Sequence, residues 1–98
     1  MDFEKVFGAL SDPSRLRILE LLPDAPSGRA FRYGRNVNQL VEELKGTQPN
    51  ISHHLKILKD AGVVQREKVR NNIYYYKNAE TLRQAREFLR RLEGSCSE

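Results

Sequence analysis

Residues 47–62 read TQPNISHHLKILKDAG, and this stretch carries the start, the stop and the periodicity of one short helix. Thr47 suits an N-cap, because its hydroxyl can accept a hydrogen bond from a backbone N–H of the first turn. Pro49 follows within that turn, where a missing N–H costs nothing. Gly62 can adopt positive φ and therefore predicts where the helix ends.

This predicted helix has one apolar side and one polar side. Its apolar residues recur at i, i+4 and i+7 and predict a stripe that packs on a core, namely Ile51, Leu55 and Leu58. At about 100° per residue, the residues on the opposite side are Ser52, His53 and Lys56. His54 falls at the edge of the apolar stripe. A short helix with such a polar side suits the major groove of DNA, so we interpret it as a recognition helix.

The composition is that of one small globular domain. The chain has 98 residues, enough for a single modest core. It shows no signal segment and no apolar run of the ~18 residues that a membrane span needs. Cys96 is the one cysteine, which excludes an internal disulfide framework. We therefore expect a cytoplasmic protein with no membrane partner.

Positive charge is concentrated in one third of the chain. The net charge is +4, and residues 47–77 contain six Lys and Arg residues against two acidic residues. The charges of the remaining residues cancel. A merely solvated surface would not need this localisation, which favours a polyanionic partner and points to nucleic-acid phosphates.

Both ends of the chain predict amphipathic helices. Residues 2–10 and 79–93 place apolar side chains at helical spacing, and Asn78 suits the N-cap of the second of these helices. The first helix is barely two turns long and cannot be stable alone. Each therefore has an apolar face that must pack on something.

A second helix is predicted to begin at Asp12-Pro13 and to run to about Leu22. It is apolar over most of its circumference, which predicts a central position in the core. Arg15 and Arg17 lie early in this helix. We interpret both as ordinary surface charge, with a phosphate contact as the alternative.

Residues 23–36 form an unusual insert. PDAPSG is typical of a loop, and the aromatic residues Phe31 and Tyr33 alternate with Val37 at the spacing of a short strand. The basic residues of this segment are Arg29, Arg32 and Arg35. Basic and aromatic residues in alternation can bind nucleic acid, but we favour a mobile surface loop that ends in an edge strand.

Residues 38–62 predict a helix-turn-helix. A third helix over 38–45, which Gly46 is expected to end, is separated from the recognition helix only by Gly46 and Thr47. Residues 63–77 then predict a wing. Two β-rich runs, Val63 to Val69 and Ile73 to Lys77, flank Arg70-Asn71-Asn72, and asparagine tolerates the left-handed φ of a tight hairpin turn.

The chain resembles the ArsR-type winged-helix repressor family. The resemblance lies in FGALSDPSRLRILELL, in TQPNISHHLKILKDAGVV and in the hairpin ending IYYY, and it covers nearly the whole chain outside 23–36. It implies a mainly α fold with a small β-hairpin, in the order α-α-(β)-α-α-β-β-α, as one winged-helix domain over residues 1–98. It also implies a homodimer and a repressor that releases its operator when an effector binds.

The resemblance carries specific site expectations. The residues expected at the dimer interface are Phe3, Val6, Phe7, Leu10, Leu82, Ala85, Phe88, Leu89 and Leu92. The residues expected to read base edges are Gln48, Ser52 and His53, assisted by Asn50 and Lys56. The wing residues expected to hold phosphates or reach the minor groove are Arg66, Lys68, Arg70, Asn71 and Asn72.

The chain departs from metal-sensing relatives at the ligands. The thiolate pair that some members carry would fall at Asn36 and Asn38, whose amides are poor ligands for soft metals. The last helix has no histidine, so the family's carboxylate-histidine site is missing. His53 and His54 are adjacent on one helix and cannot face one ion together. We expect no regulatory metal and no cofactor.

Two classes of function remain open. The first is a dimeric, sequence-specific repressor or regulator that binds a palindromic operator in double-stranded DNA and is associated with the nucleoid. The second is a winged-helix module that binds a protein or RNA through its basic face. An enzyme is not expected, because no Ser-His-acid set, Gly-rich phosphate loop or metal-ligand cluster is present. The effector and any redox role of Cys96 are left open.

Overall fold

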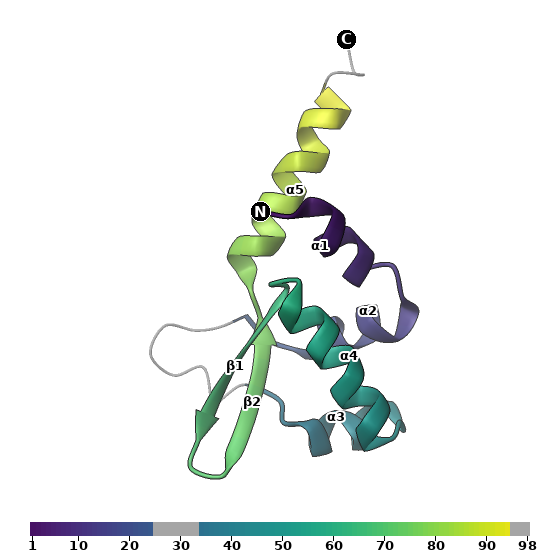
Figure 1. The fold of residues 1–98 in the computed structure, drawn as a ribbon, viewed down its shortest axis with the longest axis vertical. Helices are drawn as coiled ribbons and strands as arrows, with labels where there is room; N and C mark the ends of the chain where they lie inside the picture. Colours follow the sequence, from purple (N-terminus) through teal and green to yellow (C-terminus); the bar gives the residue numbers. More distant parts are fainter. Residues whose placement is uncertain (25–33, 95–98) are drawn as a thin grey trace.

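The computed structural model describes residues 1–24 and 34–94, which form five helices and one antiparallel hairpin (Figure 1). The elements in chain order are α1 (Phe3–Ala9), α2 (Pro13–Leu21), α3 (Val37–Leu44), α4 (Gln48–Asp60), β1 (Val64–Val69), β2 (Asn72–Lys77) and α5 (Ala79–Gly94). The predicted winged helix-turn-helix is confirmed: α3 and α4 form the helix-turn-helix, and β1 and β2 form the wing.

Short polar side chains begin every helix. Side-chain oxygens accept hydrogen bonds from backbone N–H groups of the first turn at Asp2, Asp12, Asn36, Thr47 and Asn78. At Asp12, desolvation raises the pKa, but hydrogen bonds from the N–H groups of Arg15 and Ser14 lower it, and the net pKa lies below 3.8. This cap is therefore ionised at neutral pH. The predicted caps at Asp12, Thr47 and Asn78 are confirmed.

The core lies where α1, α2, α3 and α4 meet the start of β1. Its fully buried side chains are Val6, Ile18, Leu22, Leu40, Leu55, Leu58 and Val63. The predicted stripe of α4 is confirmed, since Ile51, Leu55 and Leu58 are all buried. Leu16 differs from the prediction. Because it is 46% exposed, the apolar residues of α2 do not pack on the core around most of the helix circumference.

The two described ends of the 23–36 insert both lie along β2. The N–H of Lys77 donates to the carbonyl of Pro23 at 2.7 Å, and Arg35 exchanges two backbone hydrogen bonds with Tyr75. Gly34 sits so close to this strand that a Cβ there would meet the Tyr75 carbonyl oxygen at 2.9 Å. Val37 begins α3, so the predicted strand does not extend to it. The expectations for Arg29, Phe31, Arg32 and Tyr33 lie outside the described residues.

Two turns use different residues from those expected. Helix α3 ends at Lys45, which has a left-handed φ of 55°, rather than at Gly46. The hairpin pairs Val69 with Asn72, and its positive φ of 58° is at Arg70 rather than at an asparagine. Gly62, in contrast, has the expected positive φ of 80° at the end of α4.

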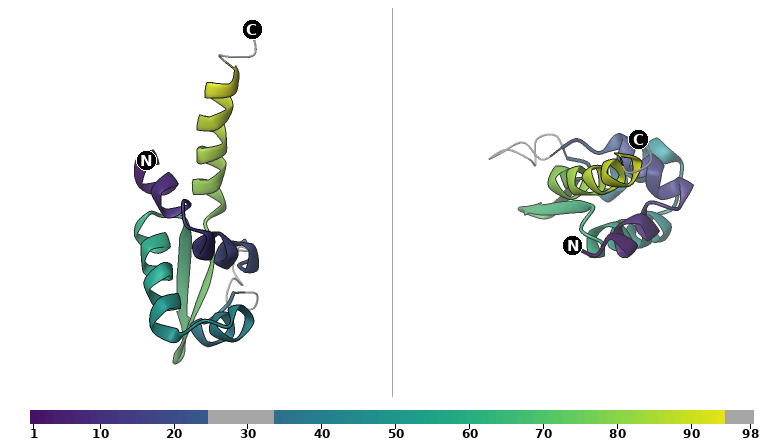
Figure 2. Two further views of the ribbon diagram at one scale, coloured as in Figure 1. Left: turned by 90° about the vertical axis from the view of Figure 1, so that its right-hand side faces the viewer. Right: turned by 90° about the horizontal axis from the view of Figure 1, so that it is seen from above.

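Helix α5 extends beyond the rest of the domain, with α1 beside its lower half (Figures 1 and 2). Leu89 and Leu92 are each 52% exposed on this helix. Within 1–24 and 34–94, no helix has the length and apolar composition that a membrane span requires.

Candidate nucleic-acid interface

The predicted base-reading residues all belong to α4, but Asn50 lies on a different side of this helix from Ser52 and Lys56. The cap at Thr47 fixes the start of the helix, and the buried stripe holds its inner side against the core. All five predicted side chains are exposed, namely Gln48, Asn50, Ser52, His53 and Lys56. The helix therefore presents hydroxyl, amide, imidazole and ammonium groups to solvent, and these groups can donate to or accept from base edges.

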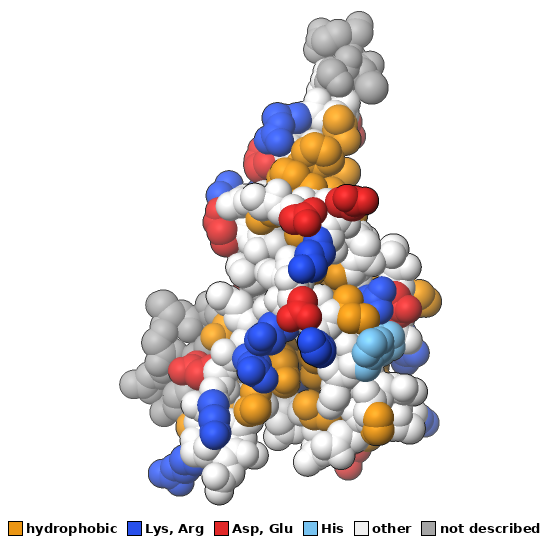
Figure 3. All heavy atoms as spheres, viewed as in Figure 1, with side chains coloured by type: hydrophobic (Ala, Val, Ile, Leu, Met, Phe, Trp, Pro, Cys, Tyr) orange, Lys and Arg blue, Asp and Glu red, His pale blue; other side chains and the backbone are white. Residues whose placement is uncertain are grey.

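A groove of about 270 Å³ lies between α4 and the wing. Its lining residues are Ser52, Leu55, Lys56, Lys59, Asp60, Arg66 and Tyr75. The structure thus brings together two predicted residues of the recognition helix and one predicted residue of the wing. Figure 3 shows Lys and Arg side chains along the hairpin and across the face between the hairpin and α4.

Lys59 is a groove residue that the site prediction omitted. Ser52, Lys56 and Lys59 recur at i, i+4 and i+7, so the periodicity of α4 was sufficient to find it. Lys56 pairs with Asp60 at 3.4 Å, with side-chain exposures of 74% and 46%. An ion pair this exposed is weak, so Lys56 can exchange Asp60 for a phosphate at little cost.

The wing supplies a basic edge beside this groove. Its five predicted residues are all exposed, namely Arg66, Lys68, Arg70, Asn71 and Asn72. Arg66 of β1 lies opposite Tyr75 of β2 in the antiparallel register. The buried Tyr75 anchors the hairpin on the core. Arg70 and Asn71 form the turn, whereas Asn72 already belongs to β2. The charges of the wing thus extend from the groove to the hairpin tip.

Arg15 is a structural residue rather than a surface charge. Its side chain is 14% exposed, and its Nε donates to the carbonyl oxygen of Ala9 at 2.7 Å. Its Nη1 lies 3.3 Å from Nδ1 of His54. Arg15 therefore joins the end of α1 to α2 and to the recognition helix. Arg17, two residues further along α2, is exposed.

An aromatic cluster joins α1 to α5. Phe3 and Phe88 stack with ring centroids 4.6 Å apart, and Phe7 lies 5.9 Å from Phe88. Two of the residues expected at the dimer interface are buried in the chain's own core, because Val6 is 1% and Ala85 is 4% exposed. The other expected residues are less buried: Leu89 and Leu92 are each 52% exposed, and the half-buried ones are Phe3, Phe7, Leu10, Leu82 and Phe88.

Metal ligands do not gather in the part of the chain that the structure describes, where no group of three or more His, Cys, Asp or Glu residues could hold an ion. Asn36, at the position of a family thiolate, is engaged as a cap: it accepts from the N–H of Gln39 at 2.8 Å and its own N–H donates to Gln39 Oε1 at 2.9 Å. Cys96 lies outside the described residues.

Comparison with known proteins gives consistent results. Residues 32–66 match the family model "Bacterial regulatory protein, arsR family". The chain is 43% identical over 72 residues to the uncharacterised HTH-type transcriptional regulator MJ1325 of Methanocaldococcus jannaschii, covering 74% of this chain and 73% of that protein. It is 36% identical to the transcriptional repressor SdpR of Bacillus subtilis, covering 79% of this chain and 77% of that protein.

A solved structure has the same fold. The ArsR-like transcriptional regulator from Rhodococcus sp. RHA1 superposes with a TM-score of 0.82 at 28% identity, covering 95% of this chain and 78% of that one. These relatives are transcriptional regulators, which are not enzymes. They lend no support to the alternative of a protein- or RNA-binding module.

Proposed function

Because this chain belongs to the ArsR family of bacterial regulatory proteins and is a DNA-binding transcriptional regulator, we propose that it acts as a homodimeric repressor of a palindromic operator. The observation that carries the DNA-binding part is the groove between α4 and the wing. Ser52 and Lys56 from the helix and Arg66 from the hairpin meet there.

The roles of the two elements differ by chemistry. Gln48, Ser52 and His53 carry groups that discriminate base edges, so they specify sequence in this proposal. Arg66, Lys68 and Arg70 carry charges that attract any phosphate, so they hold and orient the duplex. Asn71 and Asn72 place amides at the wing tip, within reach of the backbone or the minor groove.

The proposed dimer uses the apolar surface of α1 and α5. Phe3, Phe7 and Phe88 form one cluster, and Leu89 and Leu92 extend it along the part of α5 that projects from the domain. A two-fold axis through this surface would place two recognition helices about one helical turn of DNA apart, which a palindromic operator matches.

Selection of bound duplexes from random DNA with the purified chain tests the function. We expect enrichment of inverted repeats, with half-sites about one turn, roughly 10 base pairs, apart. The same selection with added metal ions tests the expectation of no regulatory metal, and the selection with reductant tests whether Cys96 has a redox role. Recovery of unrelated sequences under every condition would refute a sequence-specific repressor.

A further inference from the structure

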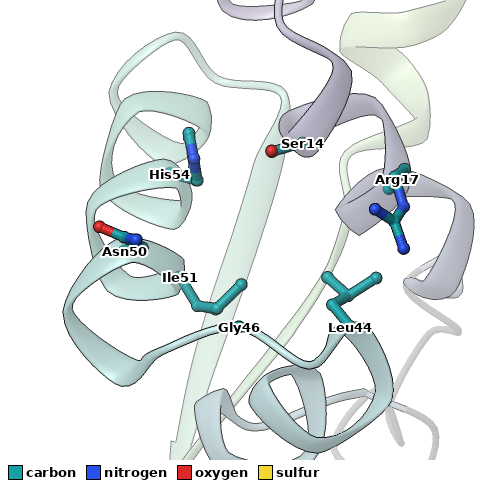
Figure 4. A pocket seen from close by; sticks show the side chains of 7 residues that line it. All are labelled: Ser14, Arg17, Leu44, Gly46, Asn50, Ile51 and His54. Carbon is teal, nitrogen blue, oxygen red and sulfur yellow. The ribbon is translucent and has the colours of Figure 1, made fainter.

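The helix-turn-helix contains a second hollow, on the other side of α4 from the groove between α4 and the wing. Its volume is about 130 Å³, and its lining residues are Ser14, Arg17, Leu44, Gly46, Asn50, Ile51 and His54 (Figure 4). The two hollows share no residue. Because Asn50 and His54 lie about half a turn of the helix wheel from Ser52 and Lys56, a duplex read by the latter does not face this pocket.

The polar groups of the pocket are suited to an anion. Arg17 contributes a guanidinium, Ser14 a hydroxyl and Asn50 an amide, while Leu44 and Ile51 form an apolar floor. No carboxylate is among the described lining residues. In contrast, each of four other hollows includes an aspartate or glutamate.

The contact between Arg15 and His54 adds a further donor. A guanidinium can only donate, so the 3.3 Å contact between Arg15 Nη1 and His54 Nδ1 is a hydrogen bond in the tautomer whose ring hydrogen is on Nε2. In that tautomer, the His54 ring that lines the pocket has a donor at Nε2. Within the described chain, the two arginines of α2 thus have separate roles: Arg15 is committed to the carbonyl of Ala9 and to His54, and Arg17 is left to bind a ligand.

We propose that this pocket is the effector site of the regulator and that it binds a small molecule through a phosphate group. A planar guanidinium with neighbouring neutral donors matches a phosphate in charge and geometry. The inference rests on the proposed function, because an effector needs an operator complex on which to act.

The position of the pocket explains how a bound phosphate would change the affinity for DNA. Arg17 is on α2, Gly46 is in the turn before α4, and Asn50 is on α4. A phosphate bound by Arg17 in a hollow that α4 also lines, through Asn50, Ile51 and His54, adds a contact between α2 and the recognition helix. This contact changes operator affinity if it favours one orientation of α4 over the orientation that the groove requires.

Inorganic phosphate is the probe for binding. Amide NMR spectra of the full chain, recorded during a phosphate titration at constant ionic strength, should show saturable shifts at Ser14, Gly46 and Asn50. Arg17→Gln should weaken the apparent affinity about tenfold. Ser14→Ala should weaken it less, since it removes one neutral hydrogen bond. Equal affinity in the wild type and in Arg17→Gln would overturn the proposal.

Arg86→Gln is the matched control. Arg86 is an exposed arginine of α5 whose Nη2 lies 4.0 Å from Oε2 of Glu87, so its charge is locally compensated. This variant should bind phosphate as the wild type does. If it loses the response to the same extent as Arg17→Gln, phosphate is binding through net charge alone and there is no specific site.

Titrations with the operator duplex distinguish an effector site from a site that holds a phosphate of the DNA backbone. At constant ionic strength, phosphate should change the Kd of the wild type for its selected duplex and leave that of Arg17→Gln unchanged. An unchanged wild-type Kd would overturn the effector role. The role also fails if Arg17→Gln weakens duplex binding without added phosphate and lowers the salt slope by about one, because the pocket would then hold a phosphate of the duplex. If the chain binds no duplex, the proposed function fails, while the NMR titration still decides whether phosphate binds.

Discussion

The rings of Phe3 and Phe88 stack with their centroids 4.6 Å apart and their planes at 20°, which ties the first helix to the last. Phe7 completes the cluster at 5.9 Å from Phe88. These rings are only partly buried within one chain, and Leu89 and Leu92 continue the apolar surface outward. A second copy of the chain is the partner that this surface fits in our proposal.

The dimer is best tested at Leu89. We expect Leu89→Asp to give a folded monomer in sedimentation equilibrium and to abolish operator binding, because the substitution places a charge in the proposed interface while the core is untouched. Phe88→Asp is less informative, since it also removes a ring that stacks within its own chain. Leu16→Asp is the control: Leu16 is exposed to a similar extent, at 46%, but lies on α2. A dimeric Leu89→Asp protein would remove α5 from the interface.

The recognition helix and the wing should respond differently to alanine. His53→Ala should lose about 1–3 kcal/mol of discrimination between operator and random DNA. Arg70→Ala should weaken both duplexes about equally and lower the salt slope by about one unit. Binding isotherms on the two duplexes at several salt concentrations measure both effects. If the two variants change specific and random binding alike, the proposed division of roles is wrong.

Arg70 has a backbone conformation that disfavours most side chains. Its φ of 58° costs a non-glycine L-residue roughly 1–2 kcal/mol, a cost that is lower for asparagine. Arg70→Asn should therefore raise the free energy of unfolding by up to about 1 kcal/mol while weakening DNA binding. Lys68→Asn is the control, because it removes a charge from β1 without relieving the backbone. Urea denaturation measures the free energy of unfolding of both variants. A gain for Arg70→Asn no larger than that for Lys68→Asn would contradict this explanation.

A side chain at Gly46 is disfavoured by packing rather than by φ. A Cβ at this position would meet Cδ1 of Ile51 at 3.3 Å, which is tighter than an ordinary contact. We expect Gly46→Ala to lose about 1 kcal/mol of stability through overpacking. Ile51→Val removes Cδ1 and should itself cost about 0.5–1.5 kcal/mol. The double variant should lose less than the two single losses combined, and strictly additive losses in denaturation would exclude this contact as the cause.

Much of the fold was predictable because the capping residues, the apolar periodicity and the helix stop in the local sequence agree with how the core packs. The caps at Asp12 and Thr47, the buried stripe of Ile51, Leu55 and Leu58, and the stop at Gly62 are each encoded within a few residues. Side-chain accessibility on α4 followed from the same periodicity. The positive φ at Lys45 and Arg70 was not predictable in this way, since neither residue favours that conformation on its own.

Contacts between distant segments could not be predicted from local pattern. Arg15 looked like surface charge, but its side chain reaches Ala9 in α1 and His54 in α4, 39 residues away. The pairing of Arg35 with Tyr75 also depends on tertiary structure, because it joins the end of the insert to the wing. Lys59 is a different case: its spacing from Ser52 and Lys56 was available in the sequence.

The salt dependence of binding to the selected duplex tests the central claim, that paired recognition helices and wings hold DNA through base edges and phosphates. If each protomer neutralises four or five phosphates, the plot of log K against log [salt] should have a slope of roughly −7 to −9. A slope near zero on that duplex would contradict the claim.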